Sequence, residues 1–170
     1  MKKIYAVIDH LMQNPSALNL MTLNKVLRLG IPFNAPHDFK IVHLDQKKSQ
    51  VQIPMKRANY NHIGGIHACA MATAGEYAAG LSLISSFGIS KYRLIMSDLS
   101  AKYVYQGKEE LIAECDKSQI DIPMIKDQLN REGRYLQTLV TKIYTKAEKK
   151  EVATITMTWQ LKNWDHVKTK

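Results

Sequence analysis

Glu76 is the residue best suited to acid–base chemistry, because it is the one charged residue between Ala68 and Phe87. The segment around it is rich in Ala, Gly, Ser and Thr, which predicts a helix of about twenty residues. Small residues and a central Glu argue against a membrane span. Burial in such a helix raises the pKa of a carboxyl group and suits it to act as general base or nucleophile. The alternative is a Glu that is exposed or paired with a distant Lys or Arg.

The loop before this helix supplies candidate hydrogen-bond donors. Gly64 and Gly65 allow the backbone to approach a ligand closely. The unpaired N–H groups at the start of a helix can stabilise an oxyanion. Asn61 and His67 add side-chain donors. The alternative interpretation is a plain turn with an Asn cap.

Two histidines and a cysteine in this region raise the question of a metal site. The spacing of His62, His67 and Cys69 matches no common zinc signature, so we expect no metal. Cys69 could act as a nucleophile with His67 as its base. Residues two apart on a helix point in different directions, which favours a small buried Cys instead.

Composition bounds the class of protein. At 170 residues, the chain is predicted to form a single domain, residues 1–170, with a real hydrophobic core. The net charge of +9 suits an anionic partner, but scattered lysines equally suit a solvated basic surface. Two cysteines make no disulfide framework, and the start of the chain lacks the pattern of a signal peptide. We therefore expect a cytoplasmic protein.

The elements around the central helix follow from hydrophobic periodicity and turn signals. Helices are expected at Ile4–Gln13, at Ala17–Leu29 after a Ser16 cap, and at Ile122–Arg131; strands are expected at Phe39–Leu44, Val51–Met55, Tyr92–Tyr105, Glu110–Cys115 (as the return strand after Tyr105), Tyr135–Tyr144 and Ala153–Leu161. This order predicts an α+β fold in which an antiparallel sheet curls around the central helix. We expect residues 1–35 to form an N-terminal helical extension and residues 36–164 to form the core.

The spacing of Asn61, Gly64, His67 and Glu76 resembles the signature of hotdog-fold acyl-CoA thioesterases of the phenylacetyl-CoA and hydroxybenzoyl-CoA types. In those enzymes an Asn and a Gly precede a His-Gly-Gly at the start of the central helix. A catalytic Asp or Glu follows nine residues after the His, as Glu76 follows His67. The resemblance covers roughly residues 39–161 and implies a hotdog fold. Within the superfamily, the expected N-terminal helices make this chain most similar to an uncharacterised thioesterase-like branch.

The resemblance implies hydrolysis of an acyl-CoA or acyl-carrier-protein thioester to a carboxylic acid and a free thiol. Backbone N–H groups near Ala68 or Cys69 would polarise the carbonyl. Glu76 would act on water as general base, or attack directly as nucleophile. His67 and Asn61 would orient the carbonyl or the water.

The same resemblance implies an assembly and a substrate class. Hotdog enzymes pair two subunits, with the loop of one facing the acid of the other, so we expect a homodimer or a dimer of dimers. No resident cofactor or metal is implied, since coenzyme A enters as part of the substrate. The positive charge would suit its phosphates or an acidic carrier protein. Candidates to line the acyl pocket are Met71, Tyr77, Leu81, Met96 and Tyr103.

Two departures from the family pattern keep other functions open. The sequence His67-Ala68-Cys69 replaces His-Gly-Gly, and Gly80 stands where some relatives carry a Ser that helps to hold the water. The first departure favours a non-catalytic hotdog module that binds acyl-CoA or a fatty acyl ligand. A hotdog dehydratase or hydratase ranks lower, because those enzymes space their His and acid differently. Nucleic-acid binding, suggested by charge alone, ranks lower still.

Overall fold

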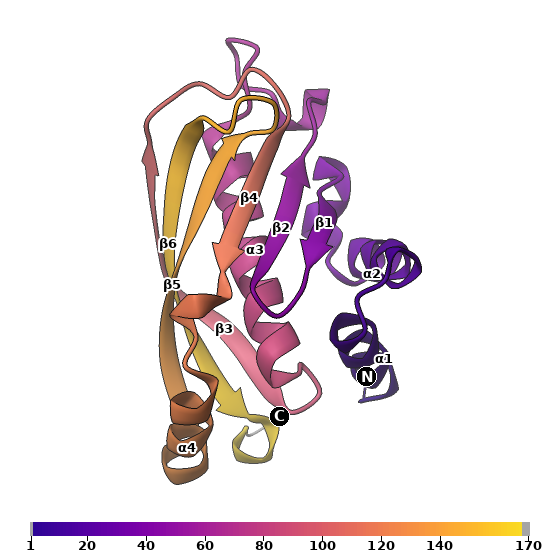
Figure 1. Ribbon diagram of the computed structural model, residues 1–170, viewed down its shortest axis with the longest axis vertical. Coiled ribbons are helices and arrows are strands. Elements are labelled where there is room, and N and C mark those ends of the chain that lie inside the picture. Colours follow the sequence, from indigo (N-terminus) through magenta and orange to yellow (C-terminus); the bar gives the residue numbers. More distant parts are fainter. Residues whose placement is uncertain (1, 168–170) are drawn as a thin grey trace.

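The computed structural model describes residues 2–167 and consists of a six-stranded antiparallel sheet curled around one long helix, α3 (Ala68–Phe87) (Figure 1). The sheet order is β1-β2-β4-β5-β6-β3. The strands are β1 (Lys40–Leu44), β2 (Lys48–Ile53), β3 (Tyr92–Tyr103), β4 (Leu111–Asp116), β5 (Arg134–Thr145) and β6 (Glu151–Asn163). The predicted α+β architecture is confirmed, and the central helix has the predicted bounds.

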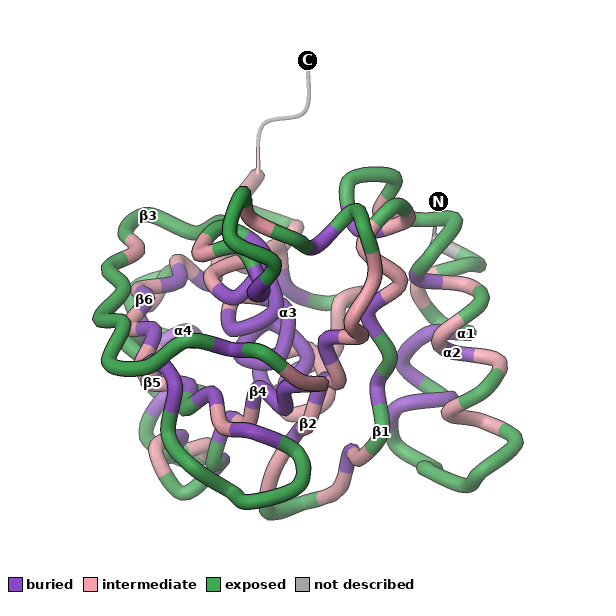
Figure 2. Tube along the Cα trace, turned by 90° about the horizontal axis from the view of Figure 1, so that it is seen from above, coloured by how far each residue is buried: buried purple, intermediate pink, exposed green. Residues whose placement is uncertain are grey.

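Helix α3 lies at the centre of the molecule, and most of its residues are buried (Figure 2). Its small residues let the sheet approach the helix backbone closely. At Gly75 an added Cβ would lie 2.7 Å from Cγ1 of Ile155 on β6. The Thr141 hydroxyl on β5 donates a 3.1 Å hydrogen bond to the Gly75 carbonyl, and the Ser49 hydroxyl on β2 donates one of 2.7 Å to the Ala78 carbonyl. These contacts fix the rotation of α3 about its axis.

Two N-terminal helices, α1 (Lys2–Gln13) and α2 (Ala17–Gly30), pack beside β1 and α3 (Figures 1 and 2). The predicted cap is present, since the Ser16 side chain accepts a 3.1 Å hydrogen bond from the Asn19 N–H. Asp9 of α1 is buried, and its carboxylate accepts hydrogen bonds from the N–H groups of Ile89 and Ser90 after α3. This carboxylate therefore ties the extension to the C-terminal end of the central helix.

One predicted strand pairing is wrong. The sequence led us to expect a hairpin between the strand ending at Tyr105 and the return strand Glu110–Cys115. Instead, β3 is an edge strand that pairs with β6, and β4 lies between β2 and β5. The connection around Gly107 crosses the loop before α3, where the Ile66 N–H donates a 2.7 Å hydrogen bond to the Gly107 carbonyl. The glycine therefore serves a crossover rather than a tight turn.

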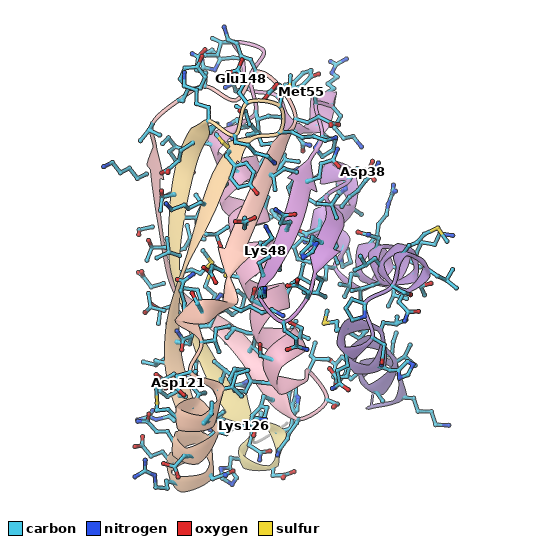
Figure 3. All side chains as sticks on the ribbon, in the orientation of Figure 1. Asp38, Lys48, Met55, Asp121, Lys126 and Glu148 are labelled. Atoms are coloured by element: carbon cyan, nitrogen blue, oxygen red, sulfur yellow. The ribbon has the colours of Figure 1, made fainter. Side chains whose placement is uncertain are left out.

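The C-terminal half follows the predicted order. Asp121 caps α4 (Ile122–Glu132) by accepting a 3.0 Å hydrogen bond from the Met124 N–H, and Lys126 lies further along the same helix (Figure 3). Along β6, the predicted alternate set is buried: Ala153, Ile155, Met157, Trp159 and Leu161.

Short 3-10 helices complete the described chain at Pro32–His37, Arg57–Asn59, Lys117–Gln119 and Trp164–His166. Among the described residues, no helix is long and apolar enough to cross a membrane.

Candidate active site

Glu76 lies in the middle of α3, one residue after the Gly75 that packs against the sheet. Its side chain is half-buried. Burial alone raises the pKa of this carboxyl to about 7, because removal of water disfavours the charged form. Within residues 2–167, the structure shows no ion pair or hydrogen bond that would hold the carboxylate ionised. The sequence left open whether Glu76 is desolvated or is paired with a Lys or Arg. In the structure it is desolvated.

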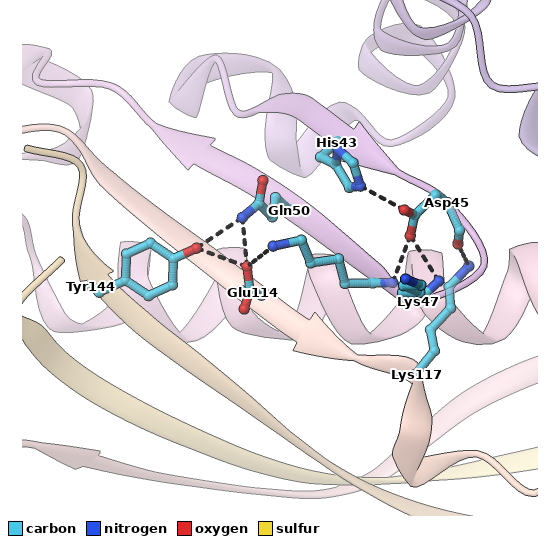
Figure 4. Close-up of polar contacts among 8 residues, drawn as sticks. His43, Asp45, Lys47, Gln50, Glu114, Lys117 and Tyr144 are labelled. Atoms are coloured by element: carbon cyan, nitrogen blue, oxygen red, sulfur yellow. Dashed lines mark hydrogen bonds and ion pairs between the residues drawn. The ribbon is translucent and has the colours of Figure 1, made fainter.

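Glu114 shows what a structural carboxylate looks like in the same protein. It lies on β4 and receives hydrogen bonds from Lys48, Gln50 and Tyr144 (Figure 4). Partial burial acts to raise its pKa, but these donors together hold it below the ordinary value. Glu114 is therefore stabilised in its ionised form, whereas Glu76 is poised to exchange a proton near neutral pH.

A cavity of about 380 Å³ lies against the face of α3 that carries Glu76. Its walls come from α3, β3, β6, the N-terminal extension and the C-terminal 3-10 helix. The lining residues are Tyr5, Leu27, Ile31, Asn34, Glu76, Tyr77, Gly80, Leu81, Ile84, Ile89, Arg93, Leu94, Ile95, Trp159 and Trp164. Tyr77 is buried beside the acid, and both burial and the nearby Glu76 charge raise the pKa of its hydroxyl. Glu76 thus faces a mainly apolar chamber.

The loop before α3 is held by its own hydrogen bonds. The Asn61 side-chain oxygen accepts bonds of 3.0 Å from the N–H groups of Ile63 and Gly65. Gly64 has φ +76°, a conformation that favours glycine. At Gly65, an added Cβ would lie 3.2 Å from the Gly107 carbonyl oxygen. The two glycines therefore shape the loop, and the Asn61 oxygen is used within it.

His67 is the N-cap of α3. Its Nδ1 accepts a 3.0 Å hydrogen bond from the Cys69 N–H, and its side chain is exposed. Tyr103 of β3 donates a 2.9 Å hydrogen bond to the Ala68 carbonyl. In the described part of the chain, the Ala68 N–H has no acceptor, unlike those of His67 and Cys69. The first turn of the helix therefore presents the unpaired Ala68 N–H close to an exposed imidazole.

The loop and the acid do not meet within one chain. Nine residues along α3 separate His67 from Glu76, which is about 13 Å at 1.5 Å per residue. Cys69 is exposed rather than buried, contrary to the expectation from sequence, and His62 is also exposed. Throughout residues 2–167, no group of three or more His, Cys, Asp or Glu side chains is placed to hold a metal ion.

Several residues around Glu76 were not identified from the sequence. Of the candidate lining residues, Tyr77 and Leu81 border the cavity, whereas Met71 is buried and Met96 and Tyr103 are partly exposed on β3. The additional walls include Tyr5, Leu27, Trp159 and Trp164. The only feature of the sequence that points to these wall residues is the recurrence of large apolar residues in the N-terminal helices and near the end of the chain.

Comparison with known proteins supports this architecture. Residues 21–161 match the family model described as domain of unknown function DUF4442. A Pseudomonas aeruginosa protein of unknown function, described as a probable thioesterase, has a TM-score of 0.74 at 20% identity, over 84% of this chain and 95% of that one. A Haemophilus influenzae thioesterase has a TM-score of 0.70 at 14% identity, over 93% and 99%.

A mutant thioesterase from Staphylococcus aureus has a TM-score of 0.63 at 15% identity, over 77% of this chain and 98% of that one. No curated protein matches this chain by sequence. The structural similarities establish the predicted hotdog fold, a sheet wrapped around a long central helix.

Proposed function

We propose that this chain, which belongs to the DUF4442 family, hydrolyses acyl thioesters of coenzyme A or of an acyl carrier protein. One observation carries the proposal: a half-buried Glu76 with a pKa of about 7 borders an apolar chamber on the central helix. A carboxyl of that pKa is a base matched to neutral pH. The thioesterases among the structural neighbours support the same class of reaction.

In the proposed reaction, Glu76 acts on the thioester from the middle of α3. As a general base it takes a proton from water while the water oxygen attacks the carbonyl carbon. The tetrahedral intermediate then expels the thiolate, which takes up a proton, and a carboxylic acid remains. As a nucleophile, the carboxylate would instead attack the carbonyl carbon and expel the thiolate, which takes up a proton. Water would then hydrolyse the resulting anhydride to the carboxylic acid and free Glu76.

The proposed oxyanion donor is the Ala68 N–H at the positive end of α3. His67 and Asn61 orient the carbonyl or the water from the same loop. Because about 13 Å of helix separates this loop from Glu76 in one chain, we propose that the loop of a second subunit completes each site. The exposed edge strand β3, with Met96 39% and Tyr103 41% exposed, offers a surface for pairing. A homodimer is then the smallest active unit, and two dimers can associate further.

The charge of the chain fits the proposed substrates. A net charge of +9 favours encounter with the phosphates of coenzyme A or with an acidic carrier protein. We propose no resident cofactor or metal, since the hydrolysis needs only the carboxyl, a backbone N–H and water.

The test of this function is thiol release from a panel of acyl-CoA thioesters, short, long and aromatic. We expect turnover with at least one thioester and none with the matching oxygen ester of the same acyl group. The absence of thiol release from every member, with acyl-carrier-protein thioesters included, would contradict hydrolysis.

One observation favours a second candidate, a non-catalytic module that binds acyl-CoA. The Cys69 N–H is taken by the His67 Nδ1, so fewer donors face a tetrahedral intermediate than in a His-Gly-Gly loop with free N–H groups. This candidate predicts that acyl-CoA raises the melting temperature without turnover. It also predicts the same rise in melting temperature for the Glu76→Ala variant.

A further inference from the structure

The cavity beside Glu76 follows α3 toward its C-terminal end. Glu76, Gly80 and Ile84 border it at successive turns, as residues four apart on a helix do. Eight residues from Glu76 to Ile84 correspond to about 12 Å along the helix axis. The chamber is therefore elongated, with the acid toward one end.

The N-terminal extension provides the opposite wall. Tyr5 of α1, Leu27 of α2 and Ile31 after α2 border the cavity across from the α3 face. Asp9 holds α1 against the chain after α3 through the hydrogen bonds described above. The extension is thus a fixed part of the chamber.

Two aromatic rings stand at the far end. The Trp164 indole Nε1 donates a 2.9 Å hydrogen bond to the Ile89 carbonyl. Its ring stacks on Tyr5 with 6.4 Å between centroids. Because a hydrogen bond and a stacked partner both hold it, Trp164 limits how far a ligand can extend from Glu76.

From this geometry we infer that the chamber binds an unbranched aliphatic acyl chain of medium length, with the Tyr5–Trp164 pair setting the upper limit. The inference rests on the proposed function, because it takes the thioester carbonyl to lie at Glu76. Elongated shape and apolar walls favour an alkyl chain over a compact aromatic acyl group, since burial of apolar surface drives its entry.

The polar neighbours of the chamber define the competing ligand. Arg93 and Trp159 border it, but the Arg93 Nε and Trp159 Nε1 atoms are covered by protein and make no hydrogen bond within the described chain. Arg93 is a cation on the wall of this cavity, so a chain that ends in a carboxylate is the competing ligand.

Binding can be measured without turnover, because both tryptophans of the chain, Trp159 and Trp164, border the chamber. We expect octanoic acid brominated near its methyl end to quench their fluorescence, whereas unbrominated octanoic acid does not. Gly80→Leu should abolish the quenching by filling the chamber. At this position an added Cβ has ordinary contacts, 3.6 Å from Trp159, so Gly80→Ala serves as the folded control. No quenching of the wild type would overturn the inference.

Chain-length profiles of thiol release test the limit at the far end. Among butyryl-, octanoyl- and palmitoyl-CoA, we expect the wild type to release thiol fastest from octanoyl-CoA. Trp164→Ala should shift the preference toward palmitoyl, and Gly80→Leu toward butyryl. If Trp164→Ala does not fold, Tyr5→Ala removes the other half of the stack and should act in the same direction.

The outcomes separate the two proposals. Hydrolysis with the same profile in wild type and variants, or a preference for a chain ending in a carboxylate, would overturn the aliphatic chamber and leave thioester hydrolysis intact. Quenching that Gly80→Leu abolishes, without hydrolysis of any thioester, would support the chamber and contradict the enzyme.

Discussion

The Thr141 hydroxyl donates a 3.1 Å hydrogen bond to the carbonyl of Gly75, the residue immediately before Glu76. This contact and the close packing of Gly75 against Ile155 set which face of α3 meets the sheet. Glu76 then faces the cavity under the N-terminal helices. The position of the acid is therefore a consequence of how the helix packs on β5 and β6.

Gly75→Ala should destabilise the fold by about 1 to 3 kcal/mol, because the new methyl would lie 2.7 Å from Ile155 and force the helix or the sheet to move. Gly80→Ala is the matched control, with its nearest contact at 3.6 Å. It should leave stability unchanged or raise it by up to about 1 kcal/mol through helix propensity. Urea unfolding of both variants measures the difference, and equal effects at the two glycines would contradict the packing described.

The raised pKa of Glu76 predicts opposite pH dependences for stability and activity. A carboxyl whose pKa rises from 4.5 to about 7 on folding stabilises the protein below the unfolded value, and this contribution is lost as pH rises through about 7. Activity should increase over the same range, because the base must be ionised. Urea unfolding and kcat/KM measured between about pH 5 and pH 8 test this, and Glu76→Gln should remove that component of the stability change.

Ala68→Pro tests the oxyanion donor directly. Proline is tolerated at the first position of a helix, and the φ of −66° and ψ of 141° at His67 suit a residue before proline. The variant should fold, lose the N–H and lose about 100-fold or more in kcat. Ala68→Gly keeps the N–H and should retain activity, so equal losses in both variants would argue against this donor.

Mixed dimers test whether each site uses two subunits. Chains carrying Ala68→Pro and chains carrying Glu76→Gln should each be inactive alone. After unfolding and refolding together, heterodimers would contain one site with an intact loop and an intact acid, so activity should return. Heterodimers that form without any recovery would place both groups of a site in one chain.

The edge strand β3 should carry the dimer contact. Met96→Lys places a charge on this strand, where lysine opposes strand pairing, and should yield monomers without activity. Leu136→Lys is the control. Leu136 is 57% exposed, but it lies on β5, which has a neighbouring strand on each side, so the variant should leave the assembly unchanged. Light scattering at matched concentrations reports the mass of each variant.

The sequence predicted those features of the fold that local patterns determine. The run of small residues gave the bounds of α3, and alternation along β6 gave its buried face. The turn signal at Gly107 misled us, because glycine serves a crossover as readily as a hairpin and only long-range pairing distinguishes them.

The candidate site was predictable only in part. Glu76 was identified because one charge in an apolar helix stands out from the sequence. The walls contributed by Tyr5 and Trp164 were missed, since these residues are far apart in sequence and meet only after the extension packs on α3. The use of the Cys69 N–H by the His67 side chain was also missed, because it depends on one rotamer at the start of the helix.

The most direct measurement of the central claim is kcat/KM for the best acyl-CoA thioester with wild type and Glu76→Gln. Glu148→Gln, an exposed change of the same kind, serves as the control. We predict a loss of about 100- to 10,000-fold for Glu76→Gln, as expected on removal of a general base, with the mass of the assembly and its melting curve intact. A Glu76→Gln variant that hydrolyses the thioester as fast as wild type would contradict the assignment of Glu76 as the catalytic carboxylate.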